Sequence, residues 1–173
     1  MKFSTAFFAT AAFLTSVPGF GLAAPTNSQR QAPSIEDIAN AANLWAQDTG
    51  KVSQFLNIAS TLSGSNFKDQ AATALMSENN ELTQKQVLDN ALGSNPSVQA
   101  ANDILVEQGT FANVVSLLQD MASNGASRVG DVETINNIRC TYVLPAIDAY
   151  FAAAAEVIQN GVQLEAVRPT ACQ

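Results

Sequence analysis

Residues 131–173 decide the fold, and they read DVETINNIRCTYVLPAIDAYFAAAAEVIQNGVQLEAVRPTACQ. Apolar residues recur in this stretch at intervals of three and four, which predicts one long helix. These positions are Val132, Ile135, Ile138, Tyr142, Ala146, Ala149 and Ala153. We expect Asp131 to cap the helix and Gly161 to end it. The same stretch contains both cysteines of the chain, Cys140 and Cys172.

Residues 1–23 are typical of a secretory signal peptide, with Lys2, an apolar segment and small residues before the cleavage site. The alternative is a membrane anchor, but its apolar segment of about 15 residues is shorter than the ~20 that a span needs. Polar residues 24–33 predict a flexible leader, in which Arg30 marks a weak further processing site. We expect residues 34–173 to form one domain that is secreted and extracellular, with cell-wall association left open. We expect no membrane span, because no later stretch is predicted to be long and apolar enough for one.

The two cysteines of a secreted chain are expected to form a disulfide. A helix of about 20 residues from Cys140 is roughly 30 Å long, and the eleven residues after Gly161 can extend roughly 40 Å. The tail is therefore long enough to return along the helix, and a Cys140–Cys172 bond would pin it there. Its 33-residue loop would contribute about 3.5–4 kcal/mol on chain-entropy grounds. The alternative is two free thiols or pairing between molecules.

The balance of acidic and basic residues limits the classes of partner that the chain can bind. Once Lys2 is removed with the signal, 7 basic residues remain against 15 acidic ones. The basic residues are scattered singly, whereas nucleic acids and anionic membranes are bound by clusters of Lys and Arg. We therefore expect no nucleic-acid partner.

The rest of the chain also predicts helices. Ser34 and Asp37 form a capping-box pattern that starts a helix running to about Leu62, with a kink or break near Thr49-Gly50. A second helical pattern starts at Phe67, and polar residues 77–81 (SENNE) on its core face predict a bend between two shorter helices. No alternating run of β-branched residues predicts a strand.

A third pattern follows residues 93–96 (GSNP), which combine a helix stop, a cap and a proline suited to the first helical turn. This pattern predicts a long helix to about Ala122, with Gly109 midway. The fold class is therefore all-α: a bundle of four or five mostly antiparallel helices with a disulfide-pinned C-terminal tail.

Catalytic equipment is sparse, since the chain has no histidine. Histidine is the commonest general base and metal ligand, and no calcium-loop pattern is present. We expect no catalytic residue, no metal site and no cofactor, and hence no enzyme. Asp148 and Glu156 lie two turns apart on one helix face, where they either mark the solvent side or line a polar spot.

Four aromatic residues are the candidate ligand-binding side chains: Trp45, Tyr142, Tyr150 and Phe151. Their alternative role is to fill the core. The run Ala152–Ala155 favours close helix contact, or else leaves volume for an apolar ligand between helices.

A resemblance to known proteins lies in two segments, which are DIANAANLWAQDTGKVSQFL (37–56) and RCTYVLPAIDAYFAAAAEVI (139–158). Together with the signal peptide they resemble small secreted proteins of filamentous ascomycete fungi, a group without an established activity. A more distant similarity is to the fungal hydrophobic-surface-binding and cell-wall mannoprotein family. That similarity implies a secreted helical bundle, and some members hold fatty acids between helices. This chain departs from that family in its expected disulfide and in lacking a Ser/Thr-rich tail.

Two main hypotheses for function follow, and a third alternative is an enzyme, which would require Asp148, Glu156 or another acid pair to converge in a cleft. The first is a secreted, non-catalytic protein that holds an apolar small molecule or contacts a hydrophobic surface. The second is an effector or elicitor that acts by contact with a host or competitor protein, and it would require an exposed apolar patch on the outside of the bundle.

Overall fold

The computed structural model describes residues 32–173, and every regular element in this range is helical. The all-α prediction is confirmed. The predicted signal peptide and nearly all of the predicted leader lie outside the described residues.

Helix α1 (Ile35–Ile58) begins at Ser34 as the sequence predicts. The Ser34 hydroxyl accepts a hydrogen bond from the Asp37 amide, and the Asp37 carboxylate accepts one from the Ser34 amide, which completes the capping box. The predicted break at Gly50 is wrong, because α1 is continuous there. A Cβ at Gly50 would approach Val167 to 3.6 Å, so the glycine lies directly under the C-terminal tail. A 3-10 turn, Ala59–Thr61, follows.

Helix α2 (Gly64–Leu92) is also continuous, so the predicted bend at residues 77–81 is wrong. The sequence pattern was misleading because polar side chains on the core face of a predicted helix usually mark a point where that face leaves the core. Here Glu78 and Glu81 remain on that face and are fully buried. Polar side chains of other helices, Arg139 and Trp45, pair with or hydrogen-bond to these two carboxyl groups.

The predicted third helix is divided instead of continuous. Asn95 caps α3 (Pro96–Asn102), a π-helical segment η2 (Asp103–Glu107) extends it, and α4 (Thr110–Asn124) follows. The division occurs at Gly109, whose φ of 70° lies in the left-handed region. A 3-10 turn, Gly125–Arg128, leads to the last helix.

The last helix runs without interruption from Asp131 to Ile158. It comprises α5 (Asp131–Ile138), a π-helical segment η4 (Arg139–Val143) and α6 (Leu144–Ile158). A π turn contains an extra residue, so it rotates the positions after it around the helix. Val143 consequently occupies the core, and Tyr142, predicted on the apolar stripe, is 47% exposed.

The predicted ends of this helix need two corrections. Gly130, not Asp131, is the N-cap, and the Asp131 carboxylate lies 2.8 Å from an Arg128 nitrogen. The helix ends at Ile158, where Gln159 adopts the left-handed conformation before Gly161 is reached.

The Asp131–Ile158 helix is long and apolar enough to span a membrane by length and composition alone. The expectation that no later segment meets this criterion is therefore wrong. The helix nevertheless contains Arg139, which is fully buried and ion-paired inside the bundle. Its apolar side chains Ile135, Val143 and Ile147 are likewise buried within the domain, as in a core helix.

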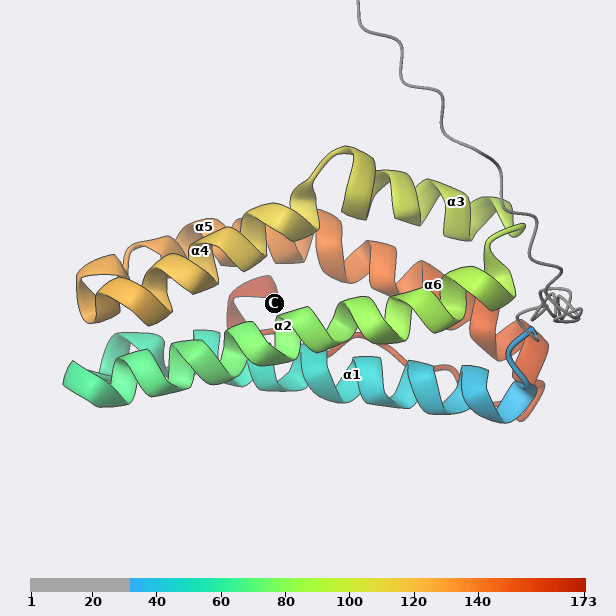
Figure 1. Ribbon diagram of the computed structural model, residues 1–173, viewed down its shortest axis with the longest axis horizontal. Helices are drawn as coiled ribbons and strands as arrows, with labels where there is room; N and C mark the ends of the chain where they lie inside the picture. The colour runs from blue at the N-terminus through green and yellow to red at the C-terminus, as the bar shows by residue number, and fades with distance from the viewer. Residues whose placement is uncertain (1–31) are drawn as a thin grey trace, which may run out of the picture. The chain divides into compact units, whose positions relative to one another are not determined.

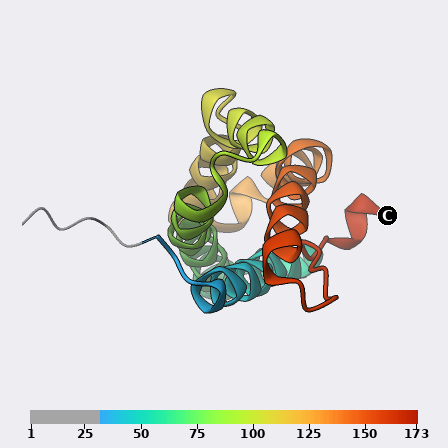
Figure 2. The ribbon, with the colours of Figure 1, turned by 90° about the vertical axis from the view of Figure 1, so that its right-hand side faces the viewer.

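The helices surround one apolar core. Helices α1 and α2 run side by side in opposite directions, and the end-on view places α1, α2, α3 and α6 around a common interior (Figures 1 and 2). Helix α4 contacts α2, while α6 contacts both α1 and α3, which closes the arrangement.

The C-terminal tail returns along the bundle and is fixed as the sequence predicts. Cys140 and Cys172 form a disulfide with their Cα atoms 5.3 Å apart, and residues Thr170–Cys172 form a short 3-10 turn. The Ser53 hydroxyl donates to the Val167 carbonyl at 2.7 Å, and the Val167 amide donates to Thr49 Oγ1 at 3.0 Å.

Candidate functional site

Three of the four predicted binding residues come together in the core. The Trp45 ring lies 5.2 Å from the Tyr150 ring and 5.9 Å from the Phe151 ring, measured between centroids. All three side chains are buried. Tyr142 lies apart from them on the surface, because of the π segment that contains it.

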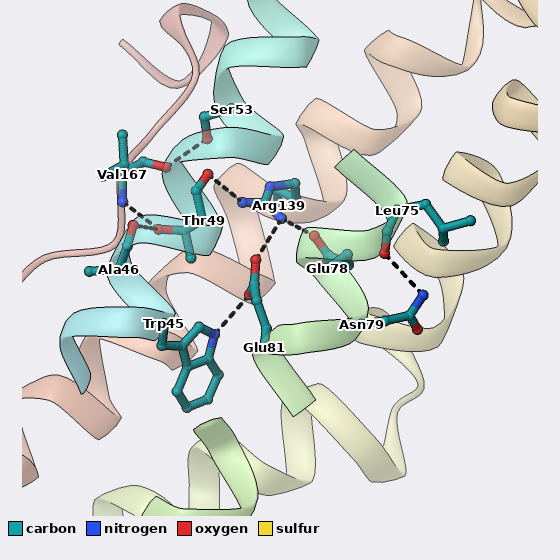
Figure 3. Close-up of polar contacts among 10 residues, drawn as sticks. All are labelled: Trp45, Ala46, Thr49, Ser53, Leu75, Glu78, Asn79, Glu81, Arg139 and Val167. Carbon is teal, nitrogen blue, oxygen red and sulfur yellow. Dashed lines mark hydrogen bonds and ion pairs between the residues drawn. The ribbon is translucent and has the colours of Figure 1, made fainter. Parts of the chain in front are cut away.

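Beside these aromatic rings lies a buried charged trio, which we define as Glu78, Glu81 and Arg139. The side chains of all three are 0% exposed. Arg139 Nη1 pairs directly with Glu78 Oε2, and it lies 3.8 Å from Glu81 Oε1. Arg139 Nη2 also donates to the Thr49 carbonyl at 3.3 Å. Figure 3 shows Arg139 reaching from the last helix toward both α2 carboxylates and α1.

Trp45 connects the aromatic core to the trio. Its indole N–H donates to Glu81 Oε2 at 2.8 Å (Figure 3). The polar edge of the only tryptophan is thereby satisfied inside the core, as a buried indole requires. The structure thus gives Trp45 a defined hydrogen-bonding partner.

A second polar cluster continues along α2 toward its C-terminus. The Asp89 carboxylate accepts from Lys85 Nζ at 2.7 Å and from the Tyr150 hydroxyl at 2.6 Å. Lys85 also donates to Asn102 of α3. Burial raises the pKa of Tyr150, and its bond to Asp89 raises the pKa further. The phenol therefore stays protonated and acts as a donor.

Burial and neighbouring charges change the pKa values of Glu78 and Glu81 in the trio. Burial raises the pKa of Glu78, although the Arg139 charge opposes this. The pKa of Glu81 is raised well above its ordinary value, chiefly by burial and next by the Glu78 charge. Arg139 and the Trp45 hydrogen bond lower it only in part. Glu81 therefore favours its neutral form more strongly than an exposed glutamate does.

An apolar groove lies between α2, η2 and α4, and we call it the α2–α4 groove. Its volume is about 350 Å³. Its apolar lining consists of Leu82, Leu105, Val106, Phe111, Ala112 and Val115. Three polar residues, Asn79, Ser116 and Gln119, complete it, and none of these described lining residues is charged.

A further pocket of about 280 Å³ lies near the C-terminal end of α2. Its lining includes Asp89, Gln99 and Asn102 and is mostly polar. Because the Asp89 oxygens already accept from Lys85 and Tyr150, this pocket offers a ligand fewer open partners than the α2–α4 groove does.

The trio is unsuited to act on a substrate, because its carboxylates have no exposed surface. Within residues 32–173, no group of three or more Cys, Asp or Glu side chains is placed to hold a metal ion. Asp148 accepts from the Ala166 amide at 2.7 Å and pairs with Arg168, so it secures the tail. Glu156 lies apart from it, in a shallow surface pocket with Val162.

Comparison with family models, with curated proteins and with solved structures gives no significant match. The function is therefore inferred from the geometry.

The sequence contained a signal for the trio but none for the groove. Glu78 and Glu81 lie within the polar run on the core face of α2, and such a run indicates either a bend or a buried network. Arg139 gave no comparable signal, because the predicted apolar stripe passes through Ile138 instead. The groove joins α2 to residues on both sides of Gly109, so it depends on how separate helices meet.

Proposed function

We propose that this chain is a secreted, non-catalytic binding protein that takes a small, uncharged apolar molecule in the α2–α4 groove. The observation that carries the proposal is an open groove with six apolar and no charged lining residues in a strongly acidic chain.

The walls of the groove fit an apolar occupant. Leu105 and Phe111 are buried and form the part continuous with the core, whereas Leu82 and Val106 are 45% and 50% exposed. Covering apolar surface is worth about 25 cal/mol per Å². A bound molecule would therefore gain stabilisation from side chains that the fold itself leaves in water.

The polar residues favour a neutral head group. Asn79 Nδ2 donates to the Leu75 carbonyl at 2.9 Å, which leaves the Asn79 amide oxygen for another donor. The Ser116 hydroxyl and the Gln119 amide are exposed beside it in the same groove. Neutral groups of this kind suit an alcohol or an amide. A carboxylate ligand would find no basic partner among the described lining residues.

Secretion is part of the proposal. It is supported by the signal-like residues 1–23 and by the Cys140–Cys172 disulfide, since such bonds persist in oxidising compartments. The fungal resemblance of residues 37–56 and 139–158 agrees with an extracellular role.

The test is calorimetric titration with 1-decanol and with decanoate, which share a chain length but differ in charge. We expect the alcohol to bind, and the carboxylate to bind at least about tenfold more weakly, which equals about 1.4 kcal/mol. Ala112→Phe fills the groove from an exposed position and should abolish binding. Ala100→Phe, at an exposed site on α3, is the matched control.

Binding of the alcohol that Ala112→Phe leaves unchanged would place the ligand elsewhere. If the wild-type chain binds neither compound, the proposal fails. The exposed apolar side chains around the groove would then favour the second hypothesis, contact with a host or competitor protein.

A further inference from the structure

The buried charged trio contains an excess of negative charge. Glu78 and Glu81 face one guanidinium, that of Arg139. The neighbouring cations are already engaged: Lys51 Nζ lies 2.8 Å from Asp48 and Lys85 Nζ lies 2.7 Å from Asp89. With both glutamates ionised, the trio would therefore carry one uncompensated charge in an interior without exposed surface.

The charges around Glu81 come from every helix that packs against it. On α2, Glu78 adds a negative charge. On α1, Trp45 donates a hydrogen bond and Asp48 adds a further negative charge. On the last helix, Arg139 supplies the opposing positive charge.

The remaining elements packed against α2 do not supply a further cation to the trio. Tyr150 of α6 donates to Asp89, and Asp120 of α4 pairs with Arg128 at 2.7 Å. The excess negative charge of the trio is therefore not compensated by a cation from these elements.

The geometry distinguishes the two glutamates. Glu78 is in direct contact with the guanidinium through Oε2. Glu81 Oε1 lies 3.8 Å away from it, and the Oε1 atoms of both glutamates have no hydrogen-bonding partner among the described residues. A buried charge without a close partner is costly, and a carboxylate removes that cost by binding a proton.

We propose that Glu81 binds a proton in the folded bundle, and that release of this proton loosens the contact of α2 with α1 and the Asp131–Ile158 helix. The bundle is thus a pH-sensitive device that is tightest in mildly acidic medium. This inference is independent of the α2–α4 groove, because none of the trio lines it.

The sign of the effect follows from linkage. Burial raises the folded-state pKa of Glu81 above its ordinary value of 4.5, so the folded chain binds more protons than the unfolded chain. The stabilisation is complete below that ordinary value and is lost as the pH rises through the raised pKa. One such group increases the unfolding equilibrium constant by up to about tenfold per pH unit within that window.

The experiment measures urea unfolding of the full chain between about pH 6 and about pH 9, a range in which ordinary carboxylates are already ionised in both states. Trp45 fluorescence serves as the probe, because its N–H contacts Glu81 directly. We expect the unfolding midpoint of the wild-type chain to fall as the pH rises. Glu81→Gln keeps an acceptor oxygen and removes the charge, so its midpoint should change little and should exceed the wild-type midpoint at the alkaline end.

Two further variants make the result decisive. Glu165→Gln, at an exposed position in the tail, should keep the wild-type slope. If Glu78→Gln flattens the slope and Glu81→Gln does not, the assignment to Glu81 is wrong. If Glu81→Gln does not fold, the wild-type chain still decides, since a midpoint that stays constant or rises over this range overturns the proposal.

Discussion

Helix α2 carries buried charged side chains among the apolar residues of its inward face, and it carries exposed apolar side chains elsewhere on its surface. The inward face carries Glu78, Glu81 and Lys85, all of them buried. The outward face carries Met76 and Leu82, which are 60% and 45% exposed. The burial of these three charged residues therefore depends on the polar partners that each of them finds, such as Arg139 for Glu78 and Asp89 for Lys85.

The difference between the two faces indicates which side of α2 would bind another molecule. On the inward face the cost of burying charge is offset by Arg139, Trp45 and Asp89, all of which lie within the same chain. On the outward face the exposed apolar surface has no such partner among the described residues. An external molecule is the partner that would complete it, which is why the groove on this side carries the proposed function.

Among substitutions that affect the inward face of α2, loss of Arg139 should reduce stability the most. Arg139→Met leaves Glu78 and Glu81 buried without a cation, so we expect a loss of about 3–5 kcal/mol in the free energy of unfolding at neutral pH. Arg128→Met is the control, because Arg128 is 41% exposed and its surface pairs are worth at most about 1 kcal/mol. Equal effects of the two substitutions in urea denaturation would contradict the role assigned to the trio.

The disulfide supports the same face, since Cys140 is adjacent to Arg139 and binds the tail that contacts Thr49. The double variant Cys140→Ser, Cys172→Ser should lose about 3–4 kcal/mol of stability because the unfolded chain gains conformational freedom. Denaturation curves of the variant and of the reduced wild-type chain should coincide. A variant as stable as the oxidised protein would show that the disulfide contributes nothing to stability.

A smaller effect is expected at Trp45. Trp45→Phe keeps an aromatic ring near Tyr150 but removes the N–H that Glu81 accepts, which should cost about 1–3 kcal/mol. Circular dichroism during denaturation measures this loss without the tryptophan. A loss below about 0.5 kcal/mol would show that the hydrogen bond to Glu81 is dispensable.

The outward face should respond in binding and hardly at all in stability. Leu82→Gln is expected to change the free energy of unfolding by less than about 0.5 kcal/mol, because the side chain is exposed. Its affinity for 1-decanol should nevertheless fall. Leu44→Gln on α1, at a similarly exposed leucine, should leave both quantities unchanged. A large stability loss at Leu82 would mean that this face is structural.

The sequence predicted the features that are local or that need only chain length. The Ser34–Asp37 capping box, the helical class and the Cys140–Cys172 pairing each follow from short patterns or from reach. The π segments could not be predicted, because an extra residue in one turn leaves no change of composition. That turn places Val143 inside and Tyr142 outside.

The candidate sites were predictable only in part for the same reason. Of the four candidate binding residues, Trp45, Tyr150 and Phe151 lie together in a buried aromatic core, and Tyr142 lies apart from them on the surface. The groove arises from residues more than twenty positions apart in the sequence, such as Leu82 and Phe111, whose meeting depends on the division of the third helix at Gly109.

The most direct test of the central claim, that an external molecule completes the outward face of α2, is native mass spectrometry of the protein purified without detergent. The account predicts a reproducible extra mass from one uncharged organic molecule, which solvent extraction removes and which Ala112→Phe lacks. A bare oxidised chain in both proteins, with no mass gained after incubation with 1-decanol, would contradict it.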